Sequence, residues 1–267
     1  MLKPLRVAVL CSHRAPGVMH LLHADPDRGR SFEIVCCVTS EPTFAEEVRV
    51  ERRGVPTRSH DIRAFYDRRK APLRGTPDVR AAYDAQTVAI LKPFAPDLIL
   101  TAGYLYLLTE PMLAAFRNRI LNLHFADLTL RTPAGEPGFP GIHAVRDTLA
   151  AGCSETCATV HLVDAGADHG PAIVRSWPFP VSRMVEEAQR WEATDLLRAY
   201  GFAHEQWMMR ACSGPMWTAA LQLVAFGAID LDRQRAFARD GQQVAPWSLG
   251  RGGTLMPPQL EPVPMAR

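Results

Sequence analysis

The chain has 267 residues, of which 47% are hydrophobic and 22% are charged, as is ordinary for a soluble globular protein with one large core. Its formal net charge of +2 is too close to neutral to favour a nucleic acid or a membrane surface as partner. No apolar run is long enough to span a bilayer, and the N-terminus leads into a strand without a cleavage-like site. We therefore expect a cytoplasmic protein.

In chain order, the first half alternates short apolar runs with amphipathic segments. The pattern predicts strands at 6–10, 32–38, 96–103 and 120–124, a weaker extended segment at 54–57, helices at 16–24, 43–53, 77–92 and 110–116, and an exposed loop at 68–76. Such alternation is typical of an α/β fold: a Rossmann-like, mostly parallel twisted sheet with helices on both faces. Ligands of such folds bind at the carboxyl ends of the strands.

The pattern changes in the second half of the chain. We expect strands at 159–163 and 171–177, then a long helical region over 183–212 with room for a second helix to 221. Two further strands at 223–226 and 235–239, with the turn dipeptide Asp240-Gly241, complete a C-terminal helix and a short β-hairpin. Residues 1–249 are thus predicted to form one catalytic domain, and residues 250–267, rich in proline, an irregular C-terminal tail.

The cysteines favour a reducing compartment and give no metal signal. Several lie in apolar, strand-like runs, as buried reduced thiols do. Cys153 and Cys157 have no second Cys or His pair placed to complete a tetrahedral site. No metal is therefore expected.

Three polar residues at predicted strand ends carry the chemistry. Asn122 and His124 end the strand at 120–124, and Asp168 follows the strand at 159–163. An amide, an imidazole and a carboxylate on neighbouring strand ends can polarise a carbonyl, hold an oxyanion and move a proton.

Four motifs in fixed order resemble the folate-dependent formyltransferase family, of the glycinamide ribonucleotide formyltransferase type. They are Ala95 to Tyr104, Asn122-Leu123-His124, Phe139-Pro140-Gly141-Ile142-His143, and Thr159-Val160-His161 with Asp168 before Gly170-Pro171. The resemblance covers roughly residues 6–181 and continues more weakly over 205–247. It implies the formyltransferase fold, with transfer of a formyl group from 10-formyltetrahydrofolate to an amine.

The resemblance also implies roles for particular residues. Asn122 and a protonated His124 would hydrogen-bond the oxygen of the tetrahedral intermediate, and Asp168 would keep His124 oriented and charged and relay protons. The pterin of the folate would lie against two turns and be read largely by their backbone groups. Those cofactor-binding residues are Tyr104, Leu105, Tyr106, Leu107, Leu108, Asp164, Ala165, Gly166 and Ala167.

The acceptor is where the sequence departs from the family. The loop after the first strand lacks the Gly-rich stretch that holds a substrate phosphate in the purine members, so glycinamide ribonucleotide is not the expected acceptor. His13 and Arg14 of this loop stay open as contacts to an anion. The loop at 130–138 is longer than in the family and borders the site. The sequence shows no pattern of the second barrel domain of the transfer RNA members, so we expect a small-molecule amine instead: an amino sugar, an amino acid derivative or a natural-product intermediate. Candidate acceptor contacts are Ser12, His13, Arg14, His143, His161 and Glu205.

Several alternatives stay open from sequence. Taken singly, Asn122 and Asp168 are ordinary turn residues and His124 an interior histidine; together, in family order, they favour a site. His161 can be structural or catalytic. His143 can neighbour a helix cap or touch the acceptor.

Three other functions are also to be weighed. The same polar residues would serve a formyltetrahydrofolate hydrolase, with water in place of the amine, and a catalytically silent folate-binding protein would share the fold. A dinucleotide-binding enzyme lacks support because no G-x-G-x-x-G follows the first strand.

Overall fold

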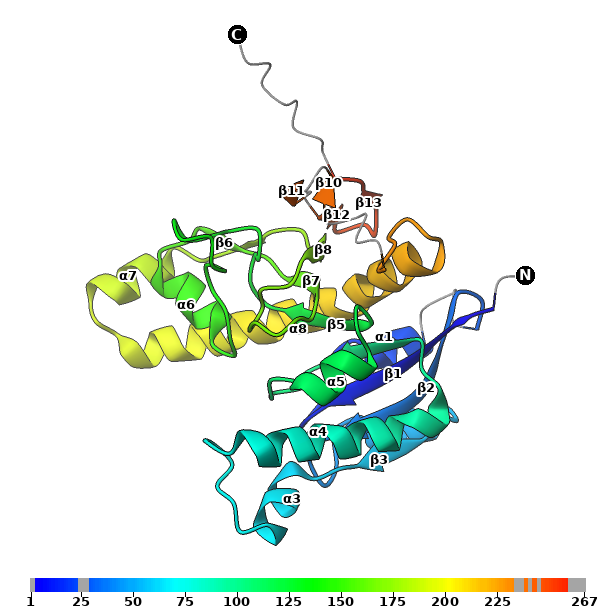
Figure 1. Ribbon diagram of the computed structural model, residues 1–267. Helices are drawn as coiled ribbons and strands as arrows, with labels where there is room; N and C mark the ends of the chain where they lie inside the picture. Colours follow the sequence, from blue (N-terminus) through cyan, green and yellow to red (C-terminus); the bar gives the residue numbers. More distant parts are fainter. Residues whose placement is uncertain (1–2, 24–28, 233–237, 240–241, 244–245, 259–267) are drawn as a thin grey trace.

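The computed structural model describes residues 3–23, 29–232, 238–239, 242–243 and 246–258 (Figure 1). Within them, one nine-stranded sheet has the order β13-β12-β8-β7-β5-β4-β1-β2-β3. Its strands are β1 (Leu5–Cys11), β2 (Phe32–Thr39), β3 (Thr57–Ser59), β4 (Leu98–Thr101), β5 (Ile120–His124), β7 (Thr159–Leu162), β8 (Ala172–Arg175), β12 (Trp247–Leu249) and β13 (Leu255–Met256). The predicted α/β, mostly parallel architecture is confirmed.

The sheet changes direction at its centre. Strands β1 to β5 pair in parallel, whereas β7 runs antiparallel to both β5 and β8. In the β5–β7 pair Asn122 lies opposite His161, so their side chains lie on the same face of the sheet. The antiparallel strand therefore brings a second polar residue to the end of β5.

Helices cover both faces of the sheet, as predicted (Figure 1). They are α1 (Val18–His23), α2 (Glu47–Glu51), α3 (Ile62–Arg68), α4 (Pro77–Leu91), α5 (Glu110–Ala115), α6 (Ala144–Ala150), α7 (Met184–Arg190) and α8 (Thr194–Ala225), with a short 3-10 turn at Lys92–Phe94. The alternation of β1 separates the two core layers: Val7 and Val9 pack with α1 and α8, while Ala8 and Leu10 pack with α4 and α5.

The long helix α8 lies close against α1 and the loop before it. A Cβ on Gly214 would come within 2.4 Å of the His20 ring, and one on Gly17 within 2.7 Å of the Ser213 backbone, so neither position has room for a side chain. The indole Nε1 of Trp217 donates to the carbonyl oxygen of Pro16 over 3.1 Å. This packing fixes one face of α8 beside the loop that follows β1.

The strand predicted at 223–226 is wrong. Helix α8 continues through Pro215 to Ala225 as a single 32-residue element, and Phe226 is its C-cap. A short apolar run fits a buried helix turn as well as a strand, and burial against the sheet decides for the helix. Proline is tolerated because it costs one backbone hydrogen bond in a helix otherwise held by its packing.

Other elements differ at their edges. Helix α3 was not predicted; it begins after Asp61, whose carboxylate caps the Ala64 N–H over 3.1 Å. The helix predicted at 43–53 is confined to α2. The irregular tail is wrong for Leu255–Met256, because that segment forms β13 and pairs antiparallel with β12.

The C-terminal hairpin is present in part, and two short strands lie elsewhere. Strands β10 (Ala238–Arg239) and β11 (Gln242–Gln243) pair antiparallel, whereas the rest of the strand predicted at 235–239 and the turn at 240–241 lie outside the described residues. Strands β6 (Glu155–Thr156) and β9 (Phe179–Pro180) form a separate antiparallel pair.

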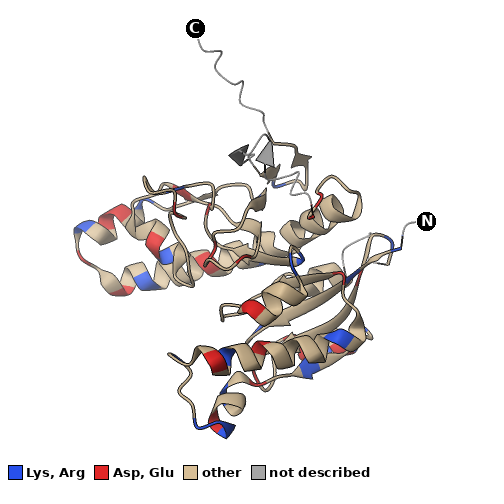
Figure 2. Ribbon diagram, viewed as in Figure 1, with Lys and Arg blue, Asp and Glu red and all other residues tan. Residues whose placement is uncertain are grey.

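Charge and cysteine placement agree with the composition. Acidic and basic residues are interspersed along α4 and along the α7–α8 end of the molecule (Figure 2). The six cysteines are free thiols, and all but the half-buried Cys153 are buried. In the part of the chain that the structure describes, no helix has the length and apolar character needed to cross a bilayer.

Candidate active site

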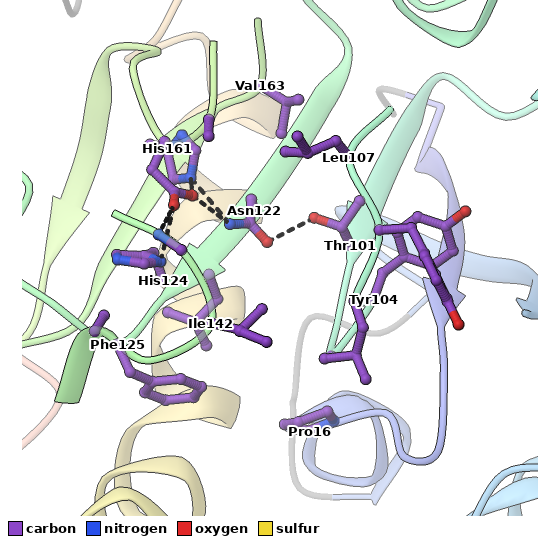
Figure 3. A pocket seen from close by; sticks show the side chains of 18 of the residues that line it. Pro16, Thr101, Tyr104, Leu107, Asn122, His124, Phe125, Ile142, His161 and Val163 are labelled. Atoms are coloured by element: carbon purple, nitrogen blue, oxygen red, sulfur yellow. Dashed lines mark hydrogen bonds and ion pairs between the residues drawn. The ribbon is translucent and has the colours of Figure 1, made fainter. Parts of the chain in front are cut away.

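The candidate site forms at the carboxyl end of β5. Asn122 pairs in register with Thr101 at the end of β4, and the Thr101 hydroxyl donates to Asn122 Oδ1 over 2.8 Å (Figure 3). Because a carboxylate oxygen only accepts, the contact to Asp168 Oδ1 identifies the other end of the amide as Nδ2, which points away from β4 toward β7. The neighbouring strand thus orients the amide before any ligand binds.

His161 of β7 meets that amide directly. Its Nε2 lies 3.0 Å from Asn122 Nδ2, and its Nδ1 lies 3.0 Å from the Leu162 carbonyl oxygen. A carbonyl only accepts, so Nδ1 carries a hydrogen, and Nε2 faces both the Asn122 amide and the Asp168 carboxylate. The contact to Leu162 therefore favours the structural interpretation, with His161 supporting Asn122 from the side.

Asp168 joins these residues from the loop after β7. Its Oδ1 lies 3.4 Å from both Asn122 Nδ2 and His161 Nε2, and its Oδ2 lies 3.5 Å from His124 Nδ1. The backbone N–H of Gly141 donates to Oδ2 over 2.7 Å. The structure thus brings Asn122, His124 and Asp168 together, although 46 positions separate the first from the last.

Two backbone features hold the Asp168 loop in this shape. Asp168 has a φ of +57°, in the left-handed region that aspartate tolerates better than most residues. Gly170 comes so close to β7 that a Cβ there would lie 1.7 Å from the Leu162 carbonyl oxygen. A glycine at 170 is therefore required for the chain to turn back into β8 while leaving Asp168 over the site.

The surroundings keep Asp168 ionised. Desolvation by burial raises its pKa, but the contact to His161, the charge of His124 and the Gly141 N–H together outweigh it and lower the pKa from 3.8 to about 2. The site therefore holds a carboxylate throughout the neutral range.

Opposing influences act on the pKa of His124. Desolvation by burial lowers it, against the opposing influence of Asp168 and the Phe139 carbonyl. Nε2 of His124 lies 2.7 Å from the Phe139 carbonyl oxygen and must donate to it, so in the neutral imidazole Nδ1 is unprotonated beside Asp168. An imidazolium would have an acceptor at each nitrogen, so the site is also arranged to receive a proton.

These residues line a cleft of about 540 Å³. Figure 3 shows Asn122 at its centre, between the two histidines and Thr101. The cleft is also lined by every residue predicted to bind the folate: Tyr104, Leu105, Tyr106, Leu107, Leu108, Asp164, Ala165, Gly166 and Ala167. Its volume lies within the usual range for small-molecule sites.

The candidate acceptor contacts divide into two groups. His13, Arg14, His161 and Glu205 line the cleft. Ser12 does not: it is fully buried, and its hydroxyl bonds to Ser40 and accepts the Leu105 N–H. His143 is exposed at the N-cap of α6 and is not among the lining residues. Ser12 therefore lies behind the cleft wall and His143 lies outside the lining, near Glu205, and an acceptor contact by either residue stays a prediction.

A buried polar network supports the turn at residues 104–109 from behind. The Arg80 guanidinium donates to the Tyr104 hydroxyl over 3.2 Å and to the Leu107 carbonyl oxygen over 2.9 Å. Asp84, one helical turn later, forms an ion pair with Arg80 at 2.7 Å and accepts from the Thr109 N–H over 2.7 Å. Helix α4 thereby fixes the wall against which the folate is predicted to lie.

Sequence reasoning missed several contributors to the cleft. Thr101, the Phe139 carbonyl and the Gly141 N–H act through pairings that only the fold reveals. Helix α8 carried a usable signal, because Phe202, Glu205, Gln206 and Met209 have the spacing of one helix face and all line the cleft. Within the described residues, no group of three or more His, Cys, Asp or Glu is placed to hold a metal ion.

The fold and the cleft define an α/β protein with an amide, an imidazole and a carboxylate gathered at the carboxyl edge of its sheet. A model of the formyl transferase family matches residues 5–190, well over half of the chain. The chain belongs to this family of folate-dependent formyltransferases.

Individual relatives agree. Phosphoribosylglycinamide formyltransferase of Mycobacterium tuberculosis is 43% identical over 102 residues, which cover 38% of this chain and 43% of that protein. The trifunctional purine biosynthetic protein adenosine-3 of Drosophila melanogaster is 30% identical over 173 residues, covering 64% of this chain and 11% of that protein. The matches thus span less than half the length of either relative.

Solved structures show the same fold. Glycinamide ribonucleotide transformylase 1 from Symbiobacterium toebii superposes with a TM-score of 0.63 at 26% identity, covering 90% of this chain and 93% of that chain. Formyltetrahydrofolate deformylase from Burkholderia mallei superposes with a TM-score of 0.59 at 21% identity, covering 86% and 68%. At 21% identity, the match to the deformylase structure shows a shared fold and nothing more.

Proposed function

We propose that this protein transfers a formyl group from 10-formyltetrahydrofolate to the amine of a small molecule. The observation that carries the proposal is the meeting of Asn122, His124 and Asp168 around one cleft. Family membership supplies the donor, and the cleft supplies a place for it.

The donor would lie against the turn at residues 104–108 and the loop at residues 164–167. Leu105 and Leu107 are exposed large apolar side chains on that turn, and a flat heterocycle would cover such surface. The Arg80 and Asp84 network keeps the turn in one conformation, so little ordering would be needed on binding. The formyl group would then extend toward Asn122.

The reaction joins the amine nitrogen to the formyl carbon and breaks the bond from that carbon to N10 of the folate. Charge builds on the formyl oxygen in the tetrahedral intermediate. Asn122, which lines the cleft, would donate to this oxygen through Nδ2, and a positioned donor of this kind lowers the barrier by roughly 3 kcal/mol.

Proton movement falls to His124 and Asp168. The attacking amine must lose a proton, and the unprotonated Nδ1 of His124 beside the Asp168 carboxylate is the acceptor within the cleft. The imidazolium so formed donates to the Phe139 oxygen and to Asp168, and its charge stabilises the oxyanion. The proton leaves to N10 as the carbon–nitrogen bond breaks.

The test is an incubation with 10-formyltetrahydrofolate, with and without a panel of primary amines. We expect formylated amine and tetrahydrofolate to appear together, detected by mass spectrometry, with little formate released when amine is left out. Rapid formate release that is independent of amine would instead establish a hydrolase.

A variant separates both reactions from silent binding. Asn122→Ala should still bind a folate analogue but lose turnover on every accepted amine. Equal turnover of the wild type and this variant across the panel would remove the amide from the mechanism.

A further inference from the structure

The cleft extends from Asn122 and His124 toward the loop after β1 and helix α8, and we call this part the acceptor arm. One wall is the loop after β1, with Arg14 and Pro16; the other is the α8 face with Phe202 and Glu205. Ile142 projects toward this arm near Phe125, and Pro16 lies opposite (Figure 3). Whatever amine attacks the formyl carbon must lie in this arm.

Several hydrogen-bond donors of the β1 loop are already used by the protein, whereas the backbone N–H groups of His13 and Arg14 have no acceptor among the described residues. The Ala15 N–H donates to Glu46 Oε2 over 2.9 Å, and the Ser12 N–H donates to the Gly103 carbonyl oxygen over 3.1 Å. Arg14 Nη1 donates to Gln206 Oε1 over 2.9 Å. An anionic group bound through the Ala15 N–H or Arg14 Nη1 would have to displace an internal acceptor, which for Ala15 is a carboxylate.

Two carboxylates also place negative charge at this loop. Glu46 holds the Ala15 N–H, and Glu41, which is only 6% exposed, lies at the end of β2 with its Oε1 3.8 Å from His13 Nε2. That Oε1 atom makes no hydrogen bond within the described structure. A phosphate brought here would meet two fixed like charges, which opposes binding more strongly near buried groups than in water.

The remaining lining of the arm is apolar. Phe202 is 64% exposed and Ile142 is 69% exposed, and Met209 lies one turn beyond Gln206 on the same helix face. Large apolar side chains held open at a cleft lose their contact with water when a ligand covers them.

Glu205 sets the polar character of this wall. It lies half-buried among the apolar side chains, and burial raises its pKa against the opposing influence of Arg14 and His143. A half-buried carboxyl group suits a hydroxyl or a cationic group of the ligand and disfavours an anion.

We propose that the acceptor is an unphosphorylated primary amine with an apolar body, which packs on Phe202 and Ile142 while its amino group reaches the formyl carbon. The inference rests on the proposed formyl transfer and names the class of amine that the arm selects. The internal carboxylates occupy the place where a substrate phosphate would need donors.

Matched acceptor pairs test this directly. Tyramine and O-phosphotyramine differ only by the phosphate, as do glycinamide riboside and glycinamide ribonucleotide. With 10-formyltetrahydrofolate as donor, kcat/KM for the unphosphorylated member of each pair should exceed that of its phosphorylated partner by about tenfold or more. Tyramine should in turn exceed glycinamide riboside, because its ring covers Phe202.

Two variants locate the selectivity. Phe202→Ala should raise KM for tyramine on the order of tenfold and leave binding of a folate analogue unchanged. Phe226→Ala is its control, since Phe226 is 67% exposed at the far end of α8 and outside the cleft. Glu46→Gln removes one negative charge and should reduce the ratio of kcat/KM for tyramine to kcat/KM for O-phosphotyramine.

The outcomes separate this inference from the proposed function. Preference for the phosphorylated members, with folate binding and formyl transfer intact, would overturn the acceptor class alone. The acceptor class would also be overturned if Glu46→Gln left the kcat/KM ratio of tyramine to O-phosphotyramine unchanged and Phe202→Ala left KM for tyramine unchanged. Failure to bind any folate analogue, measured by calorimetry, would overturn the proposed function itself.

Discussion

The two walls of the cleft are built differently. The folate-side wall at residues 104–109 is fixed from behind by the buried pair Arg80 and Asp84, which bonds backbone and side chain alike. The acceptor-side wall presents exposed apolar side chains, led by Phe202 and Ile142, and one hydrogen bond from Arg14 to Gln206. A wall fixed by buried hydrogen bonds restricts which ligand can bind against it. A wall made of exposed side chains can become specific for another ligand through a few substitutions.

The largest expected effect lies where the two walls meet. Asp168→Asn keeps the shape of the side chain but removes the charge that faces His124, so kcat should fall about 1000-fold. Steady-state rates on any accepted amine give the measurement, with Asp232→Asn, at an exposed ion pair to Arg119, as control. Near wild-type kcat/KM in Asp168→Asn would remove this carboxylate from the chemistry.

The loop that carries Asp168 should be the least tolerant part of the site. Gly170→Ala introduces a methyl group at a position where a Cβ would lie only 1.7 Å from the Leu162 carbonyl oxygen, so the backbone must shift. We expect a loss of about 3 kcal/mol in the free energy of unfolding, measured in urea. Gly252→Ala is the control, because nothing lies within 4 Å of its Cβ position. Equal stability of the two variants would contradict the close approach.

Acid should weaken the folate-side wall first. His60 stacks on Tyr83 of α4 at 4.0 Å, and burial lowers its pKa from 6.5 to about 4. The unfolded chain therefore takes up this proton near pH 6.5 and the folded chain only near pH 4, so stability falls as the pH drops through that window, by about 3 kcal/mol at most.

Hydrogen exchange at pH 7 and pH 5 measures this difference. Protection of residues 104–109 and α4 should fall more than protection of α8, and His60→Gln should flatten the dependence. A loss of protection confined to α8 would contradict this prediction.

The smallest expected effect concerns the Arg80 guanidinium, which bonds two groups of the folate-side turn at once. Arg80→Lys keeps the charge beside Asp84 but cannot bond both Tyr104 and the Leu107 carbonyl, so KM for 10-formyltetrahydrofolate should rise about tenfold with little change in kcat. Arg210→Lys, at an exposed position of α8, is the control. A fall in kcat without a rise in KM would place Arg80 elsewhere in the mechanism.

The sequence predicted some elements and site residues correctly and missed others. Alternating apolar runs predicted the parallel strands and α4, and the order of the motifs predicted that Asn122, His124 and Asp168 would meet. The prediction of a strand at residues 223–226 is wrong. A four-residue apolar run has no period of its own, so the packing of α8 determines that these residues continue the helix.

The remaining contacts depend on long-range pairing. The Phe139 carbonyl and the Gly141 N–H reach the site from a loop, and backbone groups leave no mark on the residue type. The lowered pKa of His124 likewise follows from its burial, which no local motif encodes.

The most direct measurement is a crystal structure with a tetrahedral analogue that joins a folate to an amine. The account predicts the analogue's oxygen within hydrogen-bond distance of Asn122 Nδ2, with His124 Nδ1 and Asp168 facing its nitrogen. An analogue bound with that oxygen in solvent, and these three side chains still bonded only to one another, would contradict it.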